Sequence, residues 1–333
     1  MTKLPVLLFI LSVVSCTTSP SDDICGNTDV LKSYTDPDGN RYQISTDGSI
    51  YNQEDCSFVA TLFVPGFENE KYATEGDKIY IVDEGGARYE VFRSFQENMD
   101  NHNDWKNLFI QDLNDRTRFI TNLTLQGPGA KTASAYLALR DCLIEQSCDF
   151  VDNNISLMAD PTDPLNTVLQ LHAYPPTPDM VVSKSSITSN VLYFAEGEDI
   201  WFSADYYIEK GMPHTIVDFE SSHVLHWGPR AFIRNGYLEI ENKFLDKQTF
   251  PQNVTSSIKV PMQRWFNLKV HFQFDEEEGI IQVWQDDELI INHLGPNIPV
   301  SNWILDALEV GISATSEETI LFVDNIQLDT SEF

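Results

Sequence analysis

The second half of the chain alternates between apolar and polar residues over long stretches. In residues 265–274 (WFNLKVHFQF) every second side chain is apolar, which places Lys269, His271 and Gln273 on the opposite face of one strand. A turn at 275–279 then leads into a return strand. Further alternating strands are predicted at residues 199–208, 280–284, 305–314 and 319–328. Strands separated by turns, with almost no helix, predict an all-β antiparallel sandwich over residues 150–333.

The first half of the chain has a different pattern. Residues 25–97 contain shorter alternating segments separated by turn sequences such as DPDGN, and we predict a small β-rich module there. Residues 98–149 are predicted to form a linker. Within this linker, residues 131–142 place Ala, Leu and Tyr at helical spacing, which indicates one short helix.

The N-terminus carries an export signal. Lys3 precedes a short apolar run at 4–14, which is typical of a secretory signal and too short to span a bilayer. The sequence VVSC that ends at Cys16 resembles the lipobox of bacterial lipoproteins, although an ordinary signal peptide is the alternative. The resemblance implies a signal peptide at 1–15, a lipid-anchored tether at 16–24, and a location in the cell envelope, at the outer membrane or cell surface.

The cysteine count agrees with this interpretation. Five cysteines are an odd number for an exported protein. If Cys16 carries lipid, four remain, and an oxidising compartment permits two disulfides. Cys142 and Cys148 are close in sequence and are expected to pair, which leaves Cys25 with Cys56.

Composition excludes two classes of protein. The chain has 21 Lys and Arg against 51 Asp and Glu, a net charge of −30. A general nucleic-acid binder needs clustered cations, so this partner is excluded. The 42% of hydrophobic residues exclude a disordered acidic tail, because such chains lack apolar groups to bury.

The strand sequences carry a family resemblance. Residues 265–274, GIIQVWQDDELI at 279–290, LEVGISA at 308–314 and LFVDNIQL at 321–328 resemble concanavalin A-like jelly rolls, and most of all the heparin lyase type of polysaccharide lyase. The resemblance covers about residues 150–330 and implies a jelly-roll β-sandwich that cleaves an acidic polysaccharide. The superfamily also contains glycoside hydrolases and non-catalytic lectins, so a glycan-binding surface lipoprotein is an alternative.

One strand distinguishes the activities within this superfamily. Related hydrolases carry an E-x-D-x-E row there, and several lyases carry Q-x-H. This chain reads TIVDFE at 215–220, with Ile216 in place of the hydrolase nucleophile. Asp218 and Glu220 share one strand face, as the carboxylate pair of a glycoside hydrolase would. The chain therefore departs from both patterns, and a hydrolase that uses Asp218 and Glu220 is a second alternative.

A basic stretch supplies candidate lyase chemistry. Residues 221–274 contain seven Lys and Arg against three Asp and Glu. β-Elimination from a uronic acid needs a cation that neutralises the carboxylate, a base for the C5 proton and an acid for the leaving oxygen. Arg230 and Arg234 suit the first task, and His226 and Tyr237 suit the base and the acid. Ordinary surface residues are the alternative interpretation.

Further side chains are predicted to bind substrate on the same polar face. They are Lys243, Lys269, His271, Gln273, Gln282 and Trp284. Gln170 and His172 form a separate Q-x-H sequence with Tyr174 on the same strand face. Asp324, in the sequence VDNI, resembles the late-strand aspartate that helps to hold a structural calcium in such sandwiches, although one carboxylate is a small part of a calcium site.

Overall fold

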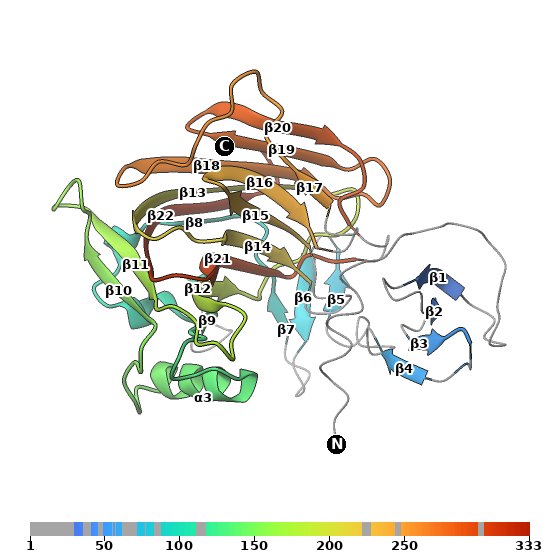
Figure 1. The fold of residues 1–333 in the computed structure, drawn as a ribbon, viewed down its shortest axis with the longest axis horizontal. Helices are drawn as coiled ribbons and strands as arrows, with labels where there is room; N and C mark the ends of the chain where they lie inside the picture. Colours follow the sequence, from blue (N-terminus) through green and yellow to red (C-terminus); the bar gives the residue numbers. More distant parts are fainter. Residues whose placement is uncertain are drawn as a thin grey trace.

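The computed structural model describes residues 30–35, 41–45, 49–54, 56, 58–61, 72–76, 78–82, 88–110, 118–221, 228–243, 248–298 and 303–333. Most of the strand residues belong to two antiparallel sheets that pack face to face (Figure 1). The predicted all-β sandwich is therefore confirmed.

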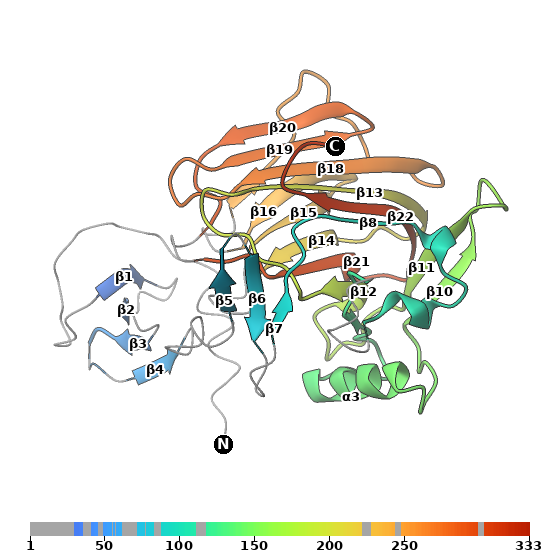
Figure 2. The ribbon, with the colours of Figure 1, turned by 180° about the vertical axis from the view of Figure 1, so that it is seen from behind.

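The first sheet has eight strands, seven of which follow the order β10-β11-β22-β13-β18-β19-β20. The eighth, β8, pairs with β22 at the back of the molecule (Figure 2). The bounds are β8 (Phe95–Glu97), β10 (Asn154–Ala159), β11 (Thr167–Ala173), β13 (Asp199–Lys210), β18 (Trp265–Gln273), β19 (Ile280–Gln285), β20 (Glu288–Leu294) and β22 (Thr319–Asp329).

The second sheet has seven strands in the order β17-β16-β15-β14-β21-β12-β9. Its central strands, β14 and β21, come from distant parts of the sequence. The bounds are β9 (Asn122–Thr124), β12 (Ser183–Ser189), β14 (Thr215–Glu220), β15 (Pro229–Arg234), β16 (Tyr237–Asn242), β17 (Gln248–Phe250) and β21 (Ala307–Thr315).

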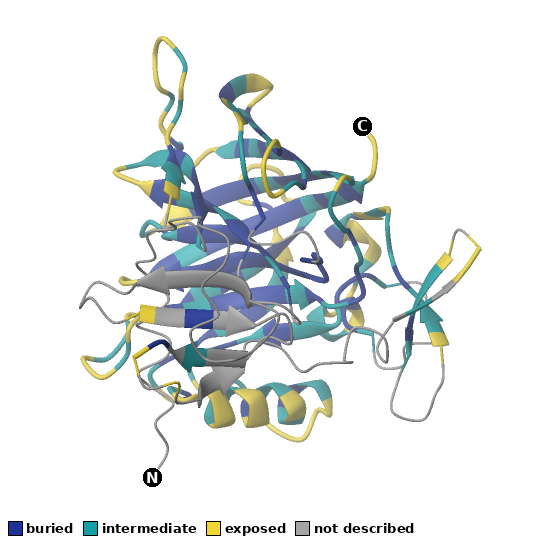
Figure 3. Cartoon of the chain, turned by 90° about the vertical axis from the view of Figure 1, so that its right-hand side faces the viewer, coloured by how far each residue is buried: buried dark blue, intermediate teal, exposed yellow. Residues whose placement is uncertain are grey.

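The core fills the space between the two sheets with aromatic and aliphatic side chains. The Phe219 ring on β14 packs edge-on against Phe202 on β13 and Phe272 on β18, with centroids 5.7 and 4.9 Å apart. Phe272 and Phe274 are fully buried, as the alternation of residues 265–274 predicts. Figure 3 shows the buried strands inside a rim of exposed loops. Because one face of each strand packs here, the other face is left for polar residues.

The sandwich begins earlier in the chain than residue 150. β8 and β9 each pair with a sandwich strand, and Met99 and Leu108 in the predicted linker are fully buried. These two residues lie in the short 3-10 helices η1 (Met99–Asn101) and η2 (Trp105–Leu108). Apolar side chains in an otherwise polar segment were the available signal, because they need a core to cover them.

The predicted helix is confirmed as α3 (Ala133–Ile144). The Thr132 hydroxyl caps its first turn by accepting a hydrogen bond from the Ala135 N–H at 3.3 Å. At the other end the predicted disulfide joins Cys142 to Cys148. Cys56 is also disulfide-bonded, whereas Cys16 and Cys25 lie outside the described residues, as do the predicted signal and tether.

The predicted N-terminal module contains two separate small sheets. One has the order β1-β2-β3-β4 and the other β5-β6-β7. On β6, Ile81 joins an apolar cluster with Val91 and Val191. The bounds are β1 (Val30–Thr35), β2 (Arg41–Ser45), β3 (Ser49–Asn52), β4 (Phe58–Thr61), β5 (Tyr72–Glu75), β6 (Lys78–Val82) and β7 (Arg88–Glu90). Within the described residues, no helix is long and apolar enough to cross a membrane.

Gly311 on β21 lies against Leu171 of the opposite sheet. It has φ +121°, and a Cβ atom there would lie 2.4 Å from Leu171 Cδ1. We predict that Gly311→Ala lowers the free energy of unfolding by about 3 kcal/mol, because strain and overlap add. Gly76→Ala is the matched control: φ is +63° with open space around it, so strain alone should cost about 1 kcal/mol. Equal losses in urea unfolding would contradict the role of close packing.

Candidate functional site

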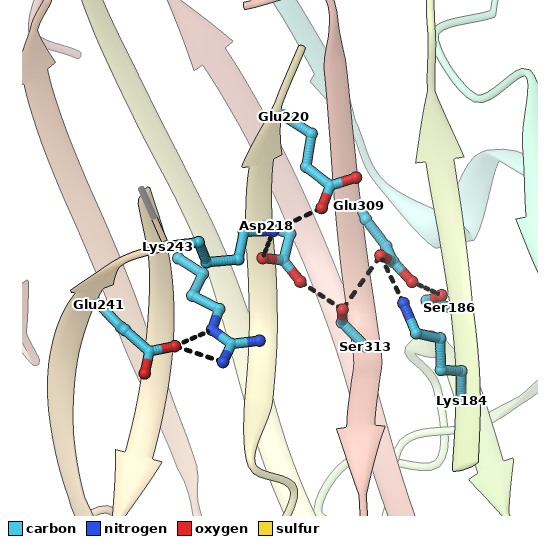
Figure 4. A network of polar contacts seen from close by, with 9 residues as sticks. Lys184, Ser186, Asp218, Glu220, Glu241, Lys243, Glu309 and Ser313 are labelled. Carbon is cyan, nitrogen blue, oxygen red and sulfur yellow. Dashed lines mark hydrogen bonds and ion pairs between the residues drawn. The ribbon is translucent and has the colours of Figure 1, made fainter. Parts of the chain in front are cut away.

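A network of charged and hydroxyl side chains crosses the outer face of the seven-stranded sheet (Figure 4). We call it the charged face. Strand alternation creates it, because Phe219 on β14 points into the core while Asp218 and Glu220 lie on the other side. Its members come from β12, β14, β15, β16 and β21 and the residue after β16: Lys184, Ser186, Asp218, Glu220, Arg230, Glu241, Lys243, Glu309 and Ser313.

Asp218 lies at the centre of the charged face. Its Oδ1 accepts a hydrogen bond from Lys243 Nζ at 2.9 Å, and the same ammonium donates to Glu220 Oε1 at 2.5 Å. The Ser313 hydroxyl donates to Asp218 Oδ2. Burial opposes ionisation, but attraction to Lys243, Arg230 and Lys184 outweighs it and lowers the pKa of Asp218 to about 2. Asp218 is therefore ionised, and Lys243 holds it beside Glu220.

Glu309 on β21 is a second buried carboxyl group in the charged face. It accepts a hydrogen bond from the Ser186 hydroxyl, and its Oε2 lies 3.0 Å from Ser313 Oγ. Lys184 Nζ is 3.5 Å away. Burial raises the pKa of Glu309 above its usual range despite Lys184. The pKa of Asp218 is thus lowered and that of Glu309 is raised. Shifted pKa values of this kind are often found at functional sites.

The two arginines of β15 differ in how firmly they are held. Arg230 Nε donates to Glu241 Oε2 at 2.6 Å, so this predicted carboxylate clamp already has an anionic partner. Arg234 is 3.6 Å from Glu239 Oε2, and 47% of its side chain is exposed. Burial raises the pKa of Glu239 although Arg234 lowers it. Arg234 is therefore the cation better placed to receive an external carboxylate.

Tyr237 lies directly opposite Arg234 across the hairpin of β15 and β16. Lys259 Nζ is 5.5 Å from the centre of its ring. Arg234, Tyr237 and Lys259 thus form one corner of the sheet, with Arg230 and Asp218 paired further along. His226 lies outside the described residues, so this corner contains one of the two groups predicted as base and acid.

The prediction that five further substrate-binding residues lie on the same polar face as the basic stretch is wrong. Lys243 belongs to the charged face, but β18 and β19 pair with β13 in the eight-stranded sheet. Five predicted residues therefore lie on the other side of the sandwich: Lys269, His271, Gln273, Gln282 and Trp284. Alternation within a strand shows which residues share its face but not to which sheet the strand belongs, and that is why the prediction failed.

Three of these residues form a cluster with Trp201, in which the aromatic rings stack and a lysine lies over them. We call this cluster the aromatic platform: Trp201, His271, Trp284 and Lys269. The ring centroids of Trp201 and His271 are 4.0 Å apart and nearly parallel, and Trp284 is 5.6 Å from Trp201. Lys269 Nζ is 4.7 Å from the centre of the Trp284 ring. The sequence prediction missed Trp201, although its strand alternates and places it on the polar face.

Hydrogen bonds fix His271 within the platform. Its Nε2 is 2.7 Å from Asp199 Oδ1, and its Nδ1 is 3.0 Å from Gln282 Oε1. Gln282 Nε2 donates to Asn292 Oδ1 at 3.2 Å. The platform thus combines apolar rings with amide and carboxylate groups at its edge.

The Q-x-H sequence lies on β11, which β22 separates from Trp201 on β13, the nearest strand of the platform. Ser156 donates to Gln170 at 3.4 Å, and His172 Nε2 is 3.2 Å from Glu318 Oε1. The His172 ring lies 4.4 Å from Tyr174. Both predicted residues therefore have partners. They lie in the eight-stranded sheet, whereas the charged face belongs to the seven-stranded sheet.

Asp324 connects segments of the chain through hydrogen bonds and is not part of a carboxylate cluster. It accepts hydrogen bonds at 3.2 Å from the Met99 N–H and from Asn166 Nδ2. Burial raises its pKa. Among the described residues there is no group of three or more His, Cys, Asp or Glu that could hold a metal ion, so calcium, which needs several oxygen ligands, finds no such cluster here.

No family model and no curated protein matches the sequence. Among solved structures, the chain is similar to an endo-β-1,4-glucuronan lyase from the fungus Trichoderma reesei, with 12% identity, 54% of this chain and 87% of that chain covered, and a TM-score of 0.42. It is similar to the alginate lyase AlgAT5 of polysaccharide lyase family 7, with 11% identity, 63% and 94% covered, and a TM-score of 0.39. These likenesses are too weak to assign a family or an activity.

Lys243→Met tests the central ion pairs. The substitution removes the ammonium group that pairs with both Asp218 and Glu220. We therefore predict that the unfolding free energy falls by about 3–5 kcal/mol at pH 7. Because the folded-state pKa of Asp218 is lowered, to about 2, its contribution is present above the unfolded pKa of about 3.9 and is lost as the pH falls towards 2. The difference from the wild type should therefore shrink below about pH 4.

Lys259→Met is the matched control, because Lys259 is exposed. It should change the unfolding free energy by less than about 0.5 kcal/mol at any pH. Chemical unfolding from pH 2 to 8 measures both variants. A Lys243→Met penalty that stays constant over this range would contradict the assigned ion pairs.

Proposed function

We propose that the protein is an exported lipoprotein, anchored by lipid on Cys16, that binds an acidic polysaccharide at the charged face and the adjoining corner of Arg234, Tyr237 and Lys259, and cleaves it by β-elimination. The observation that supports this most strongly is the corner where half-exposed Arg234 lies opposite Tyr237. A guanidinium group grips a carboxylate with two parallel hydrogen bonds. A phenol beside it can exchange a proton with the sugar.

The proposed reaction assigns one task to each group. Arg234, assisted by Arg230, neutralises the uronate carboxylate and so acidifies the neighbouring C5–H. His226 removes that proton, the electron pair forms the C4–C5 double bond, and the C4–O bond breaks. Tyr237 supplies the proton that the leaving oxygen takes up. Lys259, 5.5 Å from the Tyr237 ring centre, favours the phenolate that remains.

The contacts of Asp218 and Glu220 argue against the hydrolase alternative. A retaining hydrolase needs one ionised and one protonated carboxyl group. The Lys243 ammonium donates hydrogen bonds to both side chains and lies between them, and Asp218 is buried, so the pair is not open to a glycosidic bond. Reducing ends without unsaturation would nevertheless identify hydrolysis in the assay described below.

We also propose that the aromatic platform binds sugar without cleaving it. Flat aromatic rings next to amide and carboxylate groups suit the mixed apolar and hydroxyl surface of a pyranose. Lys269, His271, Gln273, Gln282 and Trp284 keep their predicted role as sugar-binding residues in this proposal, at a second surface. Gln170 and His172 on β11 would extend that surface towards the other side of the same sheet.

Incubation with a panel of polyuronates tests the proposal. The wild type should release unsaturated uronates that absorb in the ultraviolet. Tyr237→Phe and Arg234→Ala should each lower kcat/KM by about 100-fold or more. Arg264→Ala is the matched control, because this arginine is 67% exposed and pairs with Asp286 away from the charged face; it should retain full activity.

The same assay separates the platform from the cleavage site. Trp284→Ala should weaken binding to the polymer while leaving the cleavage of short oligosaccharides unchanged. Leu294→Ala, an exposed apolar residue on β20 of the same sheet, is its control. A complete panel that is bound without unsaturated product would overturn the lyase proposal in favour of a glycan-binding lipoprotein.

A further inference from the structure

The Ser313 hydroxyl lies between two buried carboxyl groups. It is within hydrogen-bond distance of Asp218 Oδ2 and is 3.0 Å from Glu309 Oε2. A hydroxyl has one proton and can donate it to one acceptor at a time. If both carboxyl groups were ionised, one of them would face the lone pairs of Ser313 without a proton between them. One of the two therefore carries a proton of its own.

The neighbours of each group show which one is protonated. Lys243 Nζ donates to Asp218 at 2.9 Å, so Asp218 is the ionised member. Glu309 has no cation so close, because Lys184 Nζ is 3.5 Å away, at the limit of a hydrogen bond. Its other oxygen accepts from Ser186. Glu309 Oε2–H can thus donate to Ser313, and Ser313 can donate to Asp218.

The charges around Glu309 lead to the same assignment. Lys184 on β12 and Lys243 after β16 balance Asp218 and Glu220 on β14. On the far side, Arg230 of β15 balances Glu241 of β16. An ionised Glu309 would be one additional buried negative charge, which is costly in a medium of low dielectric constant. Burial, Asp218 and Glu220 all raise the pKa of Glu309, whereas Lys184 and the hydrogen bond from Ser186 lower it, with a net rise.

We infer that Glu309 is protonated at neutral pH and that the chain Glu309–Ser313–Asp218 makes the charged face a pH-sensitive switch. When Glu309 is protonated, it donates to Ser313, and Ser313 donates to Asp218, which keeps Asp218 beside Lys243. The protonated Glu309 adds no negative charge. When the proton leaves at alkaline pH, a negative charge develops beside Asp218 and the chain of hydrogen bonds loses its direction. Both changes destabilise the fold, and the added negative charge opposes an anionic ligand.

Glu309→Gln is the direct test, because the amide retains one donor for Ser313 and one acceptor for Ser186. A carboxyl group with a raised folded-state pKa stabilises the fold below its unfolded pKa and loses that contribution as the pH rises through its folded pKa. The stability of Glu309→Gln relative to the wild type should therefore rise from pH 5 to 9. Over the steepest part, the ratio of the two unfolding constants should change up to tenfold per pH unit.

Glu318→Gln provides a control of opposite sign. Hydrogen bonds from Lys210 and His172 lower the pKa of Glu318, so removing its charge should cost relative stability as the pH rises out of the acid range. If Glu309→Gln follows the pattern of Glu318→Gln, Glu309 is ionised in an ion pair with Lys184 and the inference is overturned.

Infrared absorption keeps the inference testable if Glu309→Gln does not fold. Asp324 and Glu239 also have raised pKa values, so the spectrum is measured on a chain with Asp324→Asn and Glu239→Gln. A carboxylic acid band at neutral pH that is lost at alkaline pH supports a proton on Glu309. A spectrum without that band contradicts it.

The consequence for binding rests on the proposed function. Wild-type affinity for a polyuronate should fall more steeply from pH 7 to 9 than that of Glu309→Gln. Parallel pH profiles would contradict the switch. If neither protein binds polyuronate at any pH, the proposed function fails, whereas the stability comparison, which needs no ligand, still decides the protonation of Glu309.

Discussion

The packing of two apolar sheet faces is the constraint on which the rest of the structure depends. Phe219 of β14 occupies the core between Phe202 and Phe272, and strand geometry then places Asp218 and Glu220 on the opposite side. Because β14 is flanked by β15 and β21, the polar residues of all three strands are brought together. The charged face is thus a consequence of the same alternation that builds the core.

A buried ion network is a poor way to stabilise a sandwich. Removing paired charges from water costs about as much as their attraction returns, and apolar residues of similar size often stabilise a fold better. The network around Asp218 and Lys243 nevertheless lies at the centre of a sheet, with one carboxyl pKa lowered and that of Glu309 raised. The proposed function, in which this face handles protons and an anionic polymer, would account for the arrangement.

Much of the fold could be predicted from local sequence, and much of the site could not. Alternation at 265–274 and the helix near Cys142 depend on neighbouring residues, and both are confirmed. Asp218 and Glu309 are neighbours because β14 pairs with β21. This contact joins residues 91 positions apart, and no local pattern encodes it. Local sequence also does not show to which sheet a strand belongs, and for this reason Trp284 was predicted on the same face as Arg230. Glu309 was visible in LEVGISA, but its burial beside a second acid was not.

A crystal structure of the Tyr237→Phe variant with an oligouronate would test the central claim most directly. Our account predicts that the sugar crosses β14, β15 and β16, with a uronate carboxylate held by the guanidinium group of Arg234. It also predicts that the C5 hydrogen points towards the segment that contains His226. An oligouronate found on the aromatic platform but not on the charged face would contradict the account and would identify a binding protein.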